Sequence, residues 1–329
     1  MQARDTANAF RFTGDDRGHY ESYFQRANHP TRPLAFWIRY TIFSPRARTD
    51  ATVGELWAVY FDGELGQISA AKQVVPWQLC QFSHSGLAAR VGDSSLSPEA
   101  LSGSVQGSNH QLSWQLDYTS PQRPLLLLPE RLYSAGFPKA KALVGSPQAR
   151  FRGRLQVDAR TIEVDDWVGS QNHNWGERHT DRYAWGQVAG FDGAPEVFLE
   201  CATASVRLGP FYTPPMSPVV LRLGEEELRF SGVRRALRAK ARYAPFSWQI
   251  RTSNEDSELQ LELSADAQKF VALPYDNPPG GQKICLNSKL AACRLRLSRK
   301  GRAPLELSTR RRAAFEILTD RSVPGVVTM

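Results

Sequence analysis

Residues 34–42 read LAFWIRYTI, and this stretch sets the fold class. Every second position carries a large apolar side chain: Leu34, Phe36, Ile38, Tyr40 and Ile42. Side chains two residues apart lie on the same face of an extended strand, and β-branched and aromatic residues favour strands. The stretch therefore predicts a β-strand that turns one apolar face toward the core.

The same alternation recurs along most of the chain. It is clearest in QLSWQLDY (111–118), ELQLEL (258–263) and CRLRLS (293–298). No stretch of a dozen residues has an apolar stripe at the helical period, so we expect only short helical turns, near residues 98–101 and 129–133. Many strands separated by turn residues predict an all-β sandwich or barrel.

Two proline-rich stretches indicate how the chain is organised. With 329 residues, 41% of them hydrophobic, the chain is long enough for two cores. Residues 208–218, LGPFYTPPMSP, disfavour both helix and central strand, so we expect one domain over residues 1–208 and a second over residues 209–329. The other stretch, residues 121–147, indicates a long excursion within the first domain, and such loops usually cover or shape a site.

Composition limits the location and the partners. No apolar run reaches the roughly 18 to 20 residues that cross a bilayer, and residues 1–16 contain no apolar segment typical of a signal peptide, so we expect a cytoplasmic protein. The formal net charge is +8, with basic residues gathered at 234–242 and 310–312. We interpret these first as a solvated surface and second as a surface for an anionic partner, such as peripheral contact with a membrane. No recognition helix, zinc finger or aromatic RNA-binding strand accompanies them, so no nucleic acid is expected as a partner.

Residues 169–187, GSQNHNWGERHTDRYAWGQ, form the densest group of polar and aromatic side chains. Four of them are able to move protons: His173, Glu177, His179 and Asp181. An extended strand would place the two histidines, Trp175 and Glu177 on one face, unless Gly176 introduces a turn or bulge. Such a group favours a binding pocket over a solvated loop.

Structural roles are the alternative for the same residues. His173 is equally well interpreted as a hydrogen-bonded core histidine, and Glu177 beside Arg178 as half of a surface ion pair worth about 0 to 1 kcal/mol. Trp175 and Trp185 could be core residues beside a tight turn. The five residues between the histidines match no zinc pattern, so no metal is expected.

Three segments, in this order, resemble one known family. HYESYF (19–24) resembles the YEWWYF-type opening of the lipocalin-like family that includes carotenoid 1,2-hydratases and AttH-type proteins. GSQNHNWGERH (169–179) resembles the central motif of that family, and LPYDNPPGGQKICLNSKLA (273–291) resembles a C-terminal stretch of tocopherol cyclase-like proteins. The resemblance implies two consecutive lipocalin-like, calycin-type antiparallel β-barrels with few short helices, and a hydrophobic ligand held in or between them.

The chain departs from the family pattern at two places. Ser22 follows Glu21, where the opening motif has paired tryptophans. Asn172 precedes His173, where hydratase-like members tend to carry Asp. Because an amide cannot act as a proton donor to an alkene, either another group is the acid or the chain lacks this activity.

Hydration or cyclisation of an isoprenoid double bond needs an acid in a dry cavity and aromatic faces for the carbocation. Burial could keep Glu177 or Asp181 protonated, and either histidine could be acid, base or relay. The candidate catalytic residues are therefore His173, Glu177, His179 and Asp181. The candidate ligand-binding residues are Tyr20, Glu21, Tyr23, Asn172, Asn174, Trp175, Tyr183 and Trp185, of which the first three line the cavity or plug the barrel end.

These residues support two hypotheses. The first is an enzyme without a cofactor that hydrates, cyclises or isomerises a lipophilic substrate of isoprenoid, carotenoid or polyketide type. The second is a non-catalytic carrier or binder of a hydrophobic small molecule, which Asn172 favours. Hydrolase, dehydrogenase and nucleotide-hydrolase motifs are missing from the sequence.

Overall fold

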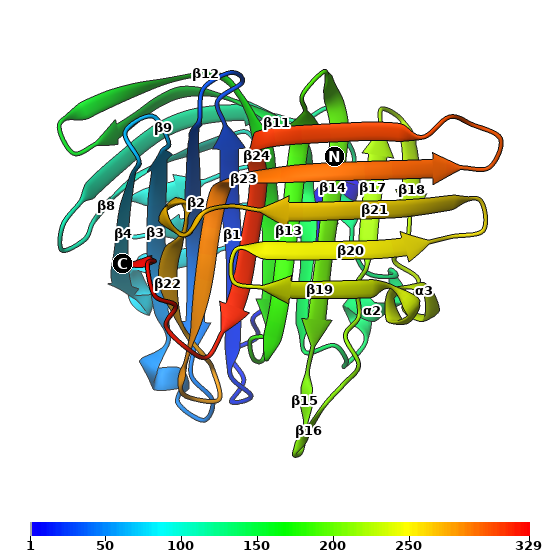
Figure 1. Ribbon diagram of the computed structural model, residues 1–329. Coiled ribbons are helices and arrows are strands. Elements are labelled where there is room, and N and C mark those ends of the chain that lie inside the picture. Colours follow the sequence, from blue (N-terminus) through cyan, green and yellow to red (C-terminus); the bar gives the residue numbers. More distant parts are fainter. Residues whose placement is uncertain (1) are drawn as a thin grey trace.

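The chain folds almost entirely into strands that form two large sheets (Figure 1). The computed structural model describes the backbone of residues 2–329 and the side chains of residues 4–329. The first sheet contains β1 (His19–Asn28), β2 (Leu34–Ser44), β3 (Val53–Asp62), β4 (Gln67–Pro76), β5 (Cys80–Phe82), β6 (Ala89–Val91), β7 (Ser94–Leu96), β8 (Ala100–Gln106), β9 (Gln111–Thr119), β10 (Leu125–Leu126), β11 (Ala140–Val157) and β12 (Arg160–Gly176).

The first sheet is an almost closed antiparallel barrel. Its strand order is β4-β3-β2-β1-β12-β11-β9-β8-β7-β6-β5, with β10 paired to β11, and β4 lies against β8 and β9. Apolar side chains fill the interior, among them Tyr23, Phe36, Tyr40, Trp114 and Phe151. The inward and outward alternation predicted from the sequence is what allows the sheet to curl around this core.

The second sheet follows in the chain. It contains β13 (Arg182–Phe191), β14 (Ala194–Ser205), β17 (Val219–Leu223), β18 (Glu226–Arg229), β19 (Lys240–Ala244), β20 (Ser247–Ser253), β21 (Ser257–Ser264), β22 (Val271–Asp276), β23 (Gln282–Arg299), β24 (Leu305–Thr319) and β25 (Val327–Thr328). The order is β18-β17-β14-β13-β24-β23-β21-β20-β19, with β22 paired to β23 and to β25. All pairs are antiparallel except β22 with β25.

The long strands β23 and β24 fold the second sheet over on itself. Their pairing shifts register between Ser288 and Cys293, and there both strands bend. Figure 1 shows β19, β20, β21 and the far halves of β23 and β24 crossing in front of β13, β14 and β17. Between these layers lies a second core that includes Leu199, Trp248 and Phe315.

Strand β2, which contains the LAFWIRYTI stretch, is buried on both faces. Phe36 and Ile38 face the first core, whereas Trp37 packs in a separate cluster with Leu273 and Tyr275 of β22. The two sheets therefore pack against each other through the outer face of β1, β2 and β3. We call the space between the sheets the interlayer. The prediction of an all-β, two-barrel fold is confirmed.

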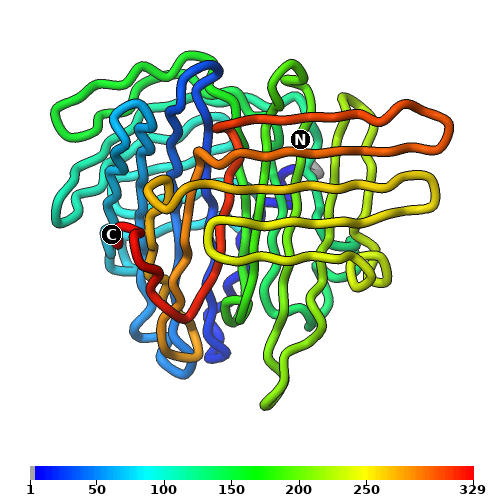
Figure 2. Tube along the Cα trace, in the orientation of Figure 1, coloured from blue at the N-terminus to red at the C-terminus, as the bar shows by residue number. Residues whose placement is uncertain are grey.

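The chain passes from the first sheet to the second between Gly176 and Arg182. The proline-rich stretch at 208–218 follows β14 and overlaps the hairpin of β15 (Arg207–Leu208) and β16 (Phe211–Tyr212), which projects from the body of the protein (Figure 2). The expected domain boundary at residue 208 stays a prediction, and the change of sheet falls earlier in the chain.

Helices are short. They are α1 (Gln2–Asn8), α2 (Arg131–Ser134), α3 (Val233–Arg238) and the 3-10 turns η1 (Thr49–Ala51), η2 (Trp77–Leu79) and η3 (Ala267–Lys269). The turn expected near residues 129–133 overlaps α2, whereas residues 98–101 bend into β8 without a helical turn. Within residues 2–329, no helix has the length and apolar character needed to cross a membrane.

Candidate functional site

Strand β12 carries the central motif and presents it on two faces. His173 pairs with Tyr23 and Asn172 pairs with Phe24 of β1, and successive side chains of β12 point to opposite sides of the sheet. His173 and Trp175 therefore point toward the N-terminal segment, whereas Asn172 points into the interlayer. The two strands come close at Gly169, where a Cβ atom would overlap the backbone of β1.

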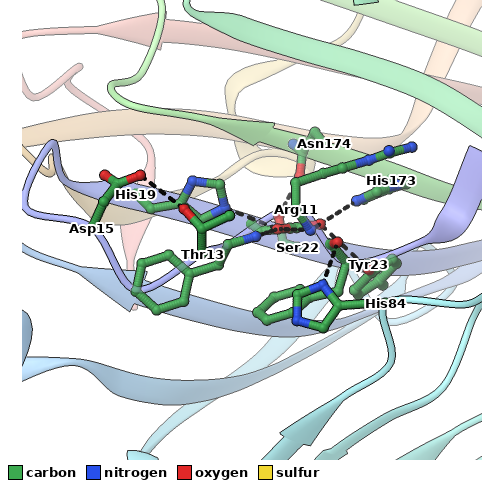
Figure 3. Close-up of polar contacts among 12 residues, drawn as sticks. Arg11, Thr13, Asp15, His19, Ser22, Tyr23, His84, His173 and Asn174 are labelled. Atoms are coloured by element: carbon green, nitrogen blue, oxygen red, sulfur yellow. Dashed lines mark hydrogen bonds and ion pairs between the residues drawn. The ribbon is translucent and has the colours of Figure 1, made fainter. Parts of the chain in front are cut away.

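On the first face, Glu21 is the centre of a buried hydrogen-bond cluster. Its carboxylate accepts hydrogen bonds from the backbone N–H groups of Arg11, at 3.0 and 2.9 Å, and Phe12, at 3.1 Å. Nε2 of His19 and Nε2 of His173 each lie 2.8 Å from a carboxylate oxygen. Figure 3 shows Arg11, His19 and His173 converging on this point.

The carboxyl of Glu21 is held in its charged form, and the cluster around it joins the N-terminal segment to the barrel. Burial by itself raises the pKa of Glu21, but the hydrogen bonds and charges of His173 and His19 outweigh burial and lower this pKa to about 2. Nδ1 of His173 lies 2.9 Å from the carbonyl oxygen of Ala7, so the ring bridges the N-terminal segment and Glu21. The cluster therefore fastens residues 7–12 to the barrel, and Tyr23 adds a hydrogen bond from its hydroxyl to the Asn8 carbonyl at 3.0 Å.

On the second face, Glu200 of β14 lies in the interlayer. Nε1 of Trp185 donates to its Oε1 at 2.7 Å, and Nε2 of Gln187 donates to its Oε2 at 2.8 Å. Gln187 also donates to Oδ1 of Asn172 at 2.9 Å and accepts from Nε of Arg26 at 2.7 Å. We call this group, Arg26, Asn172, Trp185, Gln187 and Glu200, the interlayer network.

Glu200 is buried, and no cation among the described side chains contacts it directly. Arg26, the basic residue of the network, donates hydrogen bonds to Gln187 and to Oδ1 of Asn28, at 2.7 Å each. Burial is therefore the main influence on Glu200, and it raises the pKa to about 7 although the bonds from Trp185 and Gln187 oppose it. A carboxyl with a raised pKa therefore lies beside the indole ring of Trp185.

An ion pair also lies in the interlayer. Nζ of Lys289 is 2.8 Å from Oε1 of Glu316 and 5.6 Å from the centre of the Trp185 ring. Burial lowers the pKa of Lys289, and the Glu316 charge partly restores it. The backbone carbonyl of Lys289 accepts a hydrogen bond from Asn28 at 2.7 Å, so this pair is joined to the interlayer network.

His179 belongs to an aromatic stack at the edge of the interlayer. Its ring lies 4.1 Å from that of Tyr20 and 5.6 Å from that of Tyr275. Burial, and then the charge of Arg39, lower the pKa of His179 to about 3, so the ring is neutral near pH 7. Its Nε2 donates to the Asp276 carbonyl at 3.2 Å.

The other two predicted acids lie near the surface. Strand β12 ends at Gly176, so Glu177 and His179 do not continue the face of His173 and Trp175. Glu177 forms ion pairs with Arg17 at 3.1 Å and Lys139 at 2.8 Å, and its side chain is 22% exposed. Asp181 accepts a hydrogen bond from the backbone N–H of Arg207 at 2.8 Å. Both carboxyls are thus held by partners near the surface, and their catalytic role stays a prediction.

The remaining predicted residues are spread over the same two faces. Trp175 lies under Arg11, whose guanidinium carbon is 5.3 Å from the ring centre. The side chain of Asn174 accepts a hydrogen bond from Ser22. Tyr183 belongs to the interlayer, where its hydroxyl is 3.8 Å from the thiol of Cys285. The sequence motif therefore supplies two separate sites and not one.

The proline-rich excursion at residues 121–147 covers one side of the interlayer. Leu125 and Leu127 pack against Phe198 and Val220 of the second sheet. The Tyr133 ring of α2 lies 6.0 Å from that of Trp175. The excursion thus packs against β14 and β17, and β14 is the strand that carries Glu200.

A groove of about 1010 Å³ lies elsewhere, on the outer face of β19, β20, β21, β23 and β24. Its wall carries basic side chains that include Lys240, Arg242 and Arg296. Acidic side chains, Glu262 and Glu306, line it as well, and the expected membrane contact stays a prediction. Among the residues with described side chains, no three His, Cys, Asp or Glu are grouped so as to hold a metal ion.

Sequence reasoning missed the main residues of the interlayer, Arg26, Glu200, Lys289 and Glu316. A signal was present, because EVFLECATA contains Glu200 within an apolar run and ICLNSKLAAC contains Lys289 in the same way. A charge inside a strand that is buried on both faces marks a buried polar site.

The family comparison agrees with the fold and with these motifs. The tocopherol cyclase-like family matches residues 138–317, more than half of the chain and including β12 and Glu200. The chain belongs to this family. Two uncharacterized proteins of Mycobacterium tuberculosis, from strains CDC 1551 / Oshkosh and H37Rv, are each 26% identical over 194 residues, which cover 59% of this chain and 58% of theirs.

Solved structures show the same fold. An AttH-type protein of Nitrosomonas europaea matches with a TM-score of 0.57 and 12% identity, over 95% of this chain and 97% of its own. Kievitone hydratase of Nectria haematococca matches with a TM-score of 0.55 and 11% identity, over 92% of this chain and 89% of its own. At such low identity these matches establish the architecture and leave the chemistry to the site.

Proposed function

We propose that the protein is an acid–base catalyst that hydrates, cyclises or isomerises a double bond of a lipophilic small molecule, of isoprenoid, carotenoid or polyketide type, without a cofactor. The observation that carries the proposal is Glu200, a buried carboxyl that Trp185 and Gln187 hold in place and that no cation of the described part of the chain contacts directly. The names of the tocopherol cyclase-like family and of kievitone hydratase support this class of chemistry.

The proposed step is redox-neutral. The protonated Glu200 carboxyl gives its proton to one alkene carbon, which leaves a carbocation at the other. In hydration a water oxygen bonds to that carbon and returns a proton to the carboxylate, so the net change is addition of water. In cyclisation a hydroxyl or a second double bond of the substrate replaces the water. A pKa near 7 lets Glu200 act in both directions at neutral pH.

The test begins with the ligand. Organic extraction of the purified protein, followed by mass spectrometry, identifies lipophiles that co-purify, and these are then incubated with the wild type and with Glu200→Gln. We expect the glutamine variant to lose about 100-fold or more in kcat. Glu163→Gln is the matched control, because Glu163 is an exposed residue paired only with Arg154 on the barrel surface among the described side chains.

The sequence-predicted acids are tested in the same assay. Turnover that survives in Glu200→Gln but is lost in Glu177→Gln would move the acid to the predicted position in the motif and contradict the proposal. His173→Ala distinguishes a catalytic role of His173 from its role in holding residues 7–12. Loss of the Glu21 cluster loosens residues 7–12 even where the chemistry is unaffected.

A second candidate function is a carrier of a hydrophobic molecule. Asn172 favours it, because its amide is fully engaged with Ser170 at 2.8 Å and Gln187 at 2.9 Å and has no proton to give to an alkene. A co-purified lipophile that is recovered chemically unchanged after incubation with the wild type, in both directions of the reaction, would favour the carrier.

A further inference from the structure

Arg39 is a buried cation for which the described residues provide no anionic partner. It lies in the middle of β2, points into the interlayer and is 4% exposed. Within the described chain no carboxylate pairs with it, and its Nε is buried without a hydrogen-bond acceptor. Burying an unpaired charge is strongly unfavourable, so a fold that keeps one there has a use for it.

The surroundings of Arg39 are aromatic. Its guanidinium carbon lies 4.5 Å from the ring centre of Tyr275, 5.9 Å from that of Trp57 and 6.0 Å from that of Trp37. Cation–π attraction offsets part of the cost of burial but satisfies none of the N–H donors. Nε1 of Trp37, on the same face of β2, is also buried without an acceptor. Two orphaned donors on one face indicate a missing acceptor.

Carboxylates in the same region are engaged elsewhere. Glu55 forms an ion pair with Lys72 at 2.7 Å and accepts a hydrogen bond from Nε1 of Trp57 at 3.1 Å. Lys72 also lies 3.9 Å from the carboxylate of Asp276. Among the described side chains, neither of these carboxylates forms an ion pair with Arg39.

An aromatic path leads from Arg39 toward Glu200. The ring of Phe24 lies 6.1 Å from that of Trp37 and 5.9 Å from that of Trp185, and Trp185 donates its hydrogen bond to Glu200. These rings belong to one packed cluster, which connects Arg39 with the carboxyl of Glu200.

We infer that Arg39 binds the carboxylate of an amphipathic small-molecule ligand whose apolar body lies against Trp37 and Phe24. A planar carboxylate matches the paired donors of a guanidinium and removes the unpaired charge. The inference rests on the proposed function for the lipophilic body of the ligand, and on Arg39 for its charge.

The experiment compares two probes that differ in charge, decanoate and decanol, by titration of tryptophan fluorescence. Trp37 and Trp57 flank Arg39, so binding there changes their emission. We expect the wild type to bind decanoate about tenfold to hundredfold more tightly than decanol. Arg39→Met should abolish this preference and leave decanol binding unchanged.

Arg222→Met is the matched control. Arg222 is equally buried, at 4% exposed, but it is fully partnered by Glu227 at 2.7 Å and by the carbonyls of Arg123 and Pro124. This variant should keep the preference for decanoate and unfold at lower urea than the wild type. Arg39→Met should be at least as stable as the wild type, because it removes an unpaired buried charge.

The outcomes are distinct. Equal affinity of the wild type for both probes, or an unchanged preference in Arg39→Met, would overturn the inference and leave the proposed function standing. Failure to bind either probe would overturn the inference together with the lipophilic ligand. Should Arg39→Met not fold, Arg39→Gln, which keeps donors but no charge, decides by the same comparison.

Discussion

Replacing Glu200 by glutamine has an effect on stability that depends on pH. Burial is the main cause that raises the pKa of Glu200 from 4.5 to about 7 in the folded protein. Between these pH values the folded protein still binds a proton that the unfolded chain has released, so stability falls as pH rises. At about 1.4 kcal/mol per pKa unit, Glu200 costs the wild type about 3 kcal/mol by the time its carboxyl is fully ionised. This loss is absent below pH 4.5 and complete somewhat above pH 7.

Glutamine mimics the protonated carboxyl at every pH. Its amide nitrogen cannot accept one of the two hydrogen bonds from Trp185 and Gln187, which lowers stability by about 1 kcal/mol without any dependence on pH. Urea unfolding of both proteins at about pH 4 and about pH 8 should therefore show Glu200→Gln less stable than the wild type in acid and more stable in base. A difference between the two proteins that is the same at both pH values would refute the reasoning, because every other titrating group is shared.

Two further predictions concern the first barrel. The ionised Glu21 carboxylate stabilises the wild type by about 3 kcal/mol above pH 4.5, and this stabilisation is lost as pH falls toward 2. Glu21→Gln should remove it and should make residues 7–12 accessible to limited proteolysis. Unchanged cleavage there would contradict the role of the cluster in holding residues 7–12. Gly169→Ala should lower the free energy of unfolding by about 3 kcal/mol or more, because its Cβ would overlap the backbone of Arg26. Urea unfolding measures this change. A loss under about 1 kcal/mol would show that β1 moves aside easily.

The fold was predictable because alternation is a local property. LAFWIRYTI lies in β2, and QLSWQLDY, ELQLEL and CRLRLS lie in β9, β21 and β23. What the pattern could not show is that β2 is buried on its second face as well. Trp37 and Arg39 look like solvent-side alternates in the sequence, and their burial depends on β22, which is more than 200 residues away in the chain.

The candidate site was predictable only in part. The motif at residues 169–187 contributes to both polar clusters, but sequence spacing could not show that Gly176 ends the strand and sends Glu177 to the surface. Nor could it show that His173 meets Glu21, since the two residues are joined by pairing of distant strands. Glu200 lies outside the motif, and its importance depends on what the second sheet places around it.

The most direct test of the account is the protonation state of Glu200. Infrared spectroscopy of the wild type and of Glu200→Gln across pH 5 to 9 reports the C=O stretch of a protonated carboxyl. The account predicts one such band in the wild type that fades with a midpoint near pH 7 and is missing from the variant. A wild-type spectrum identical to that of the variant at pH 6 would contradict it, because Glu200 would then be ionised and unable to protonate a double bond.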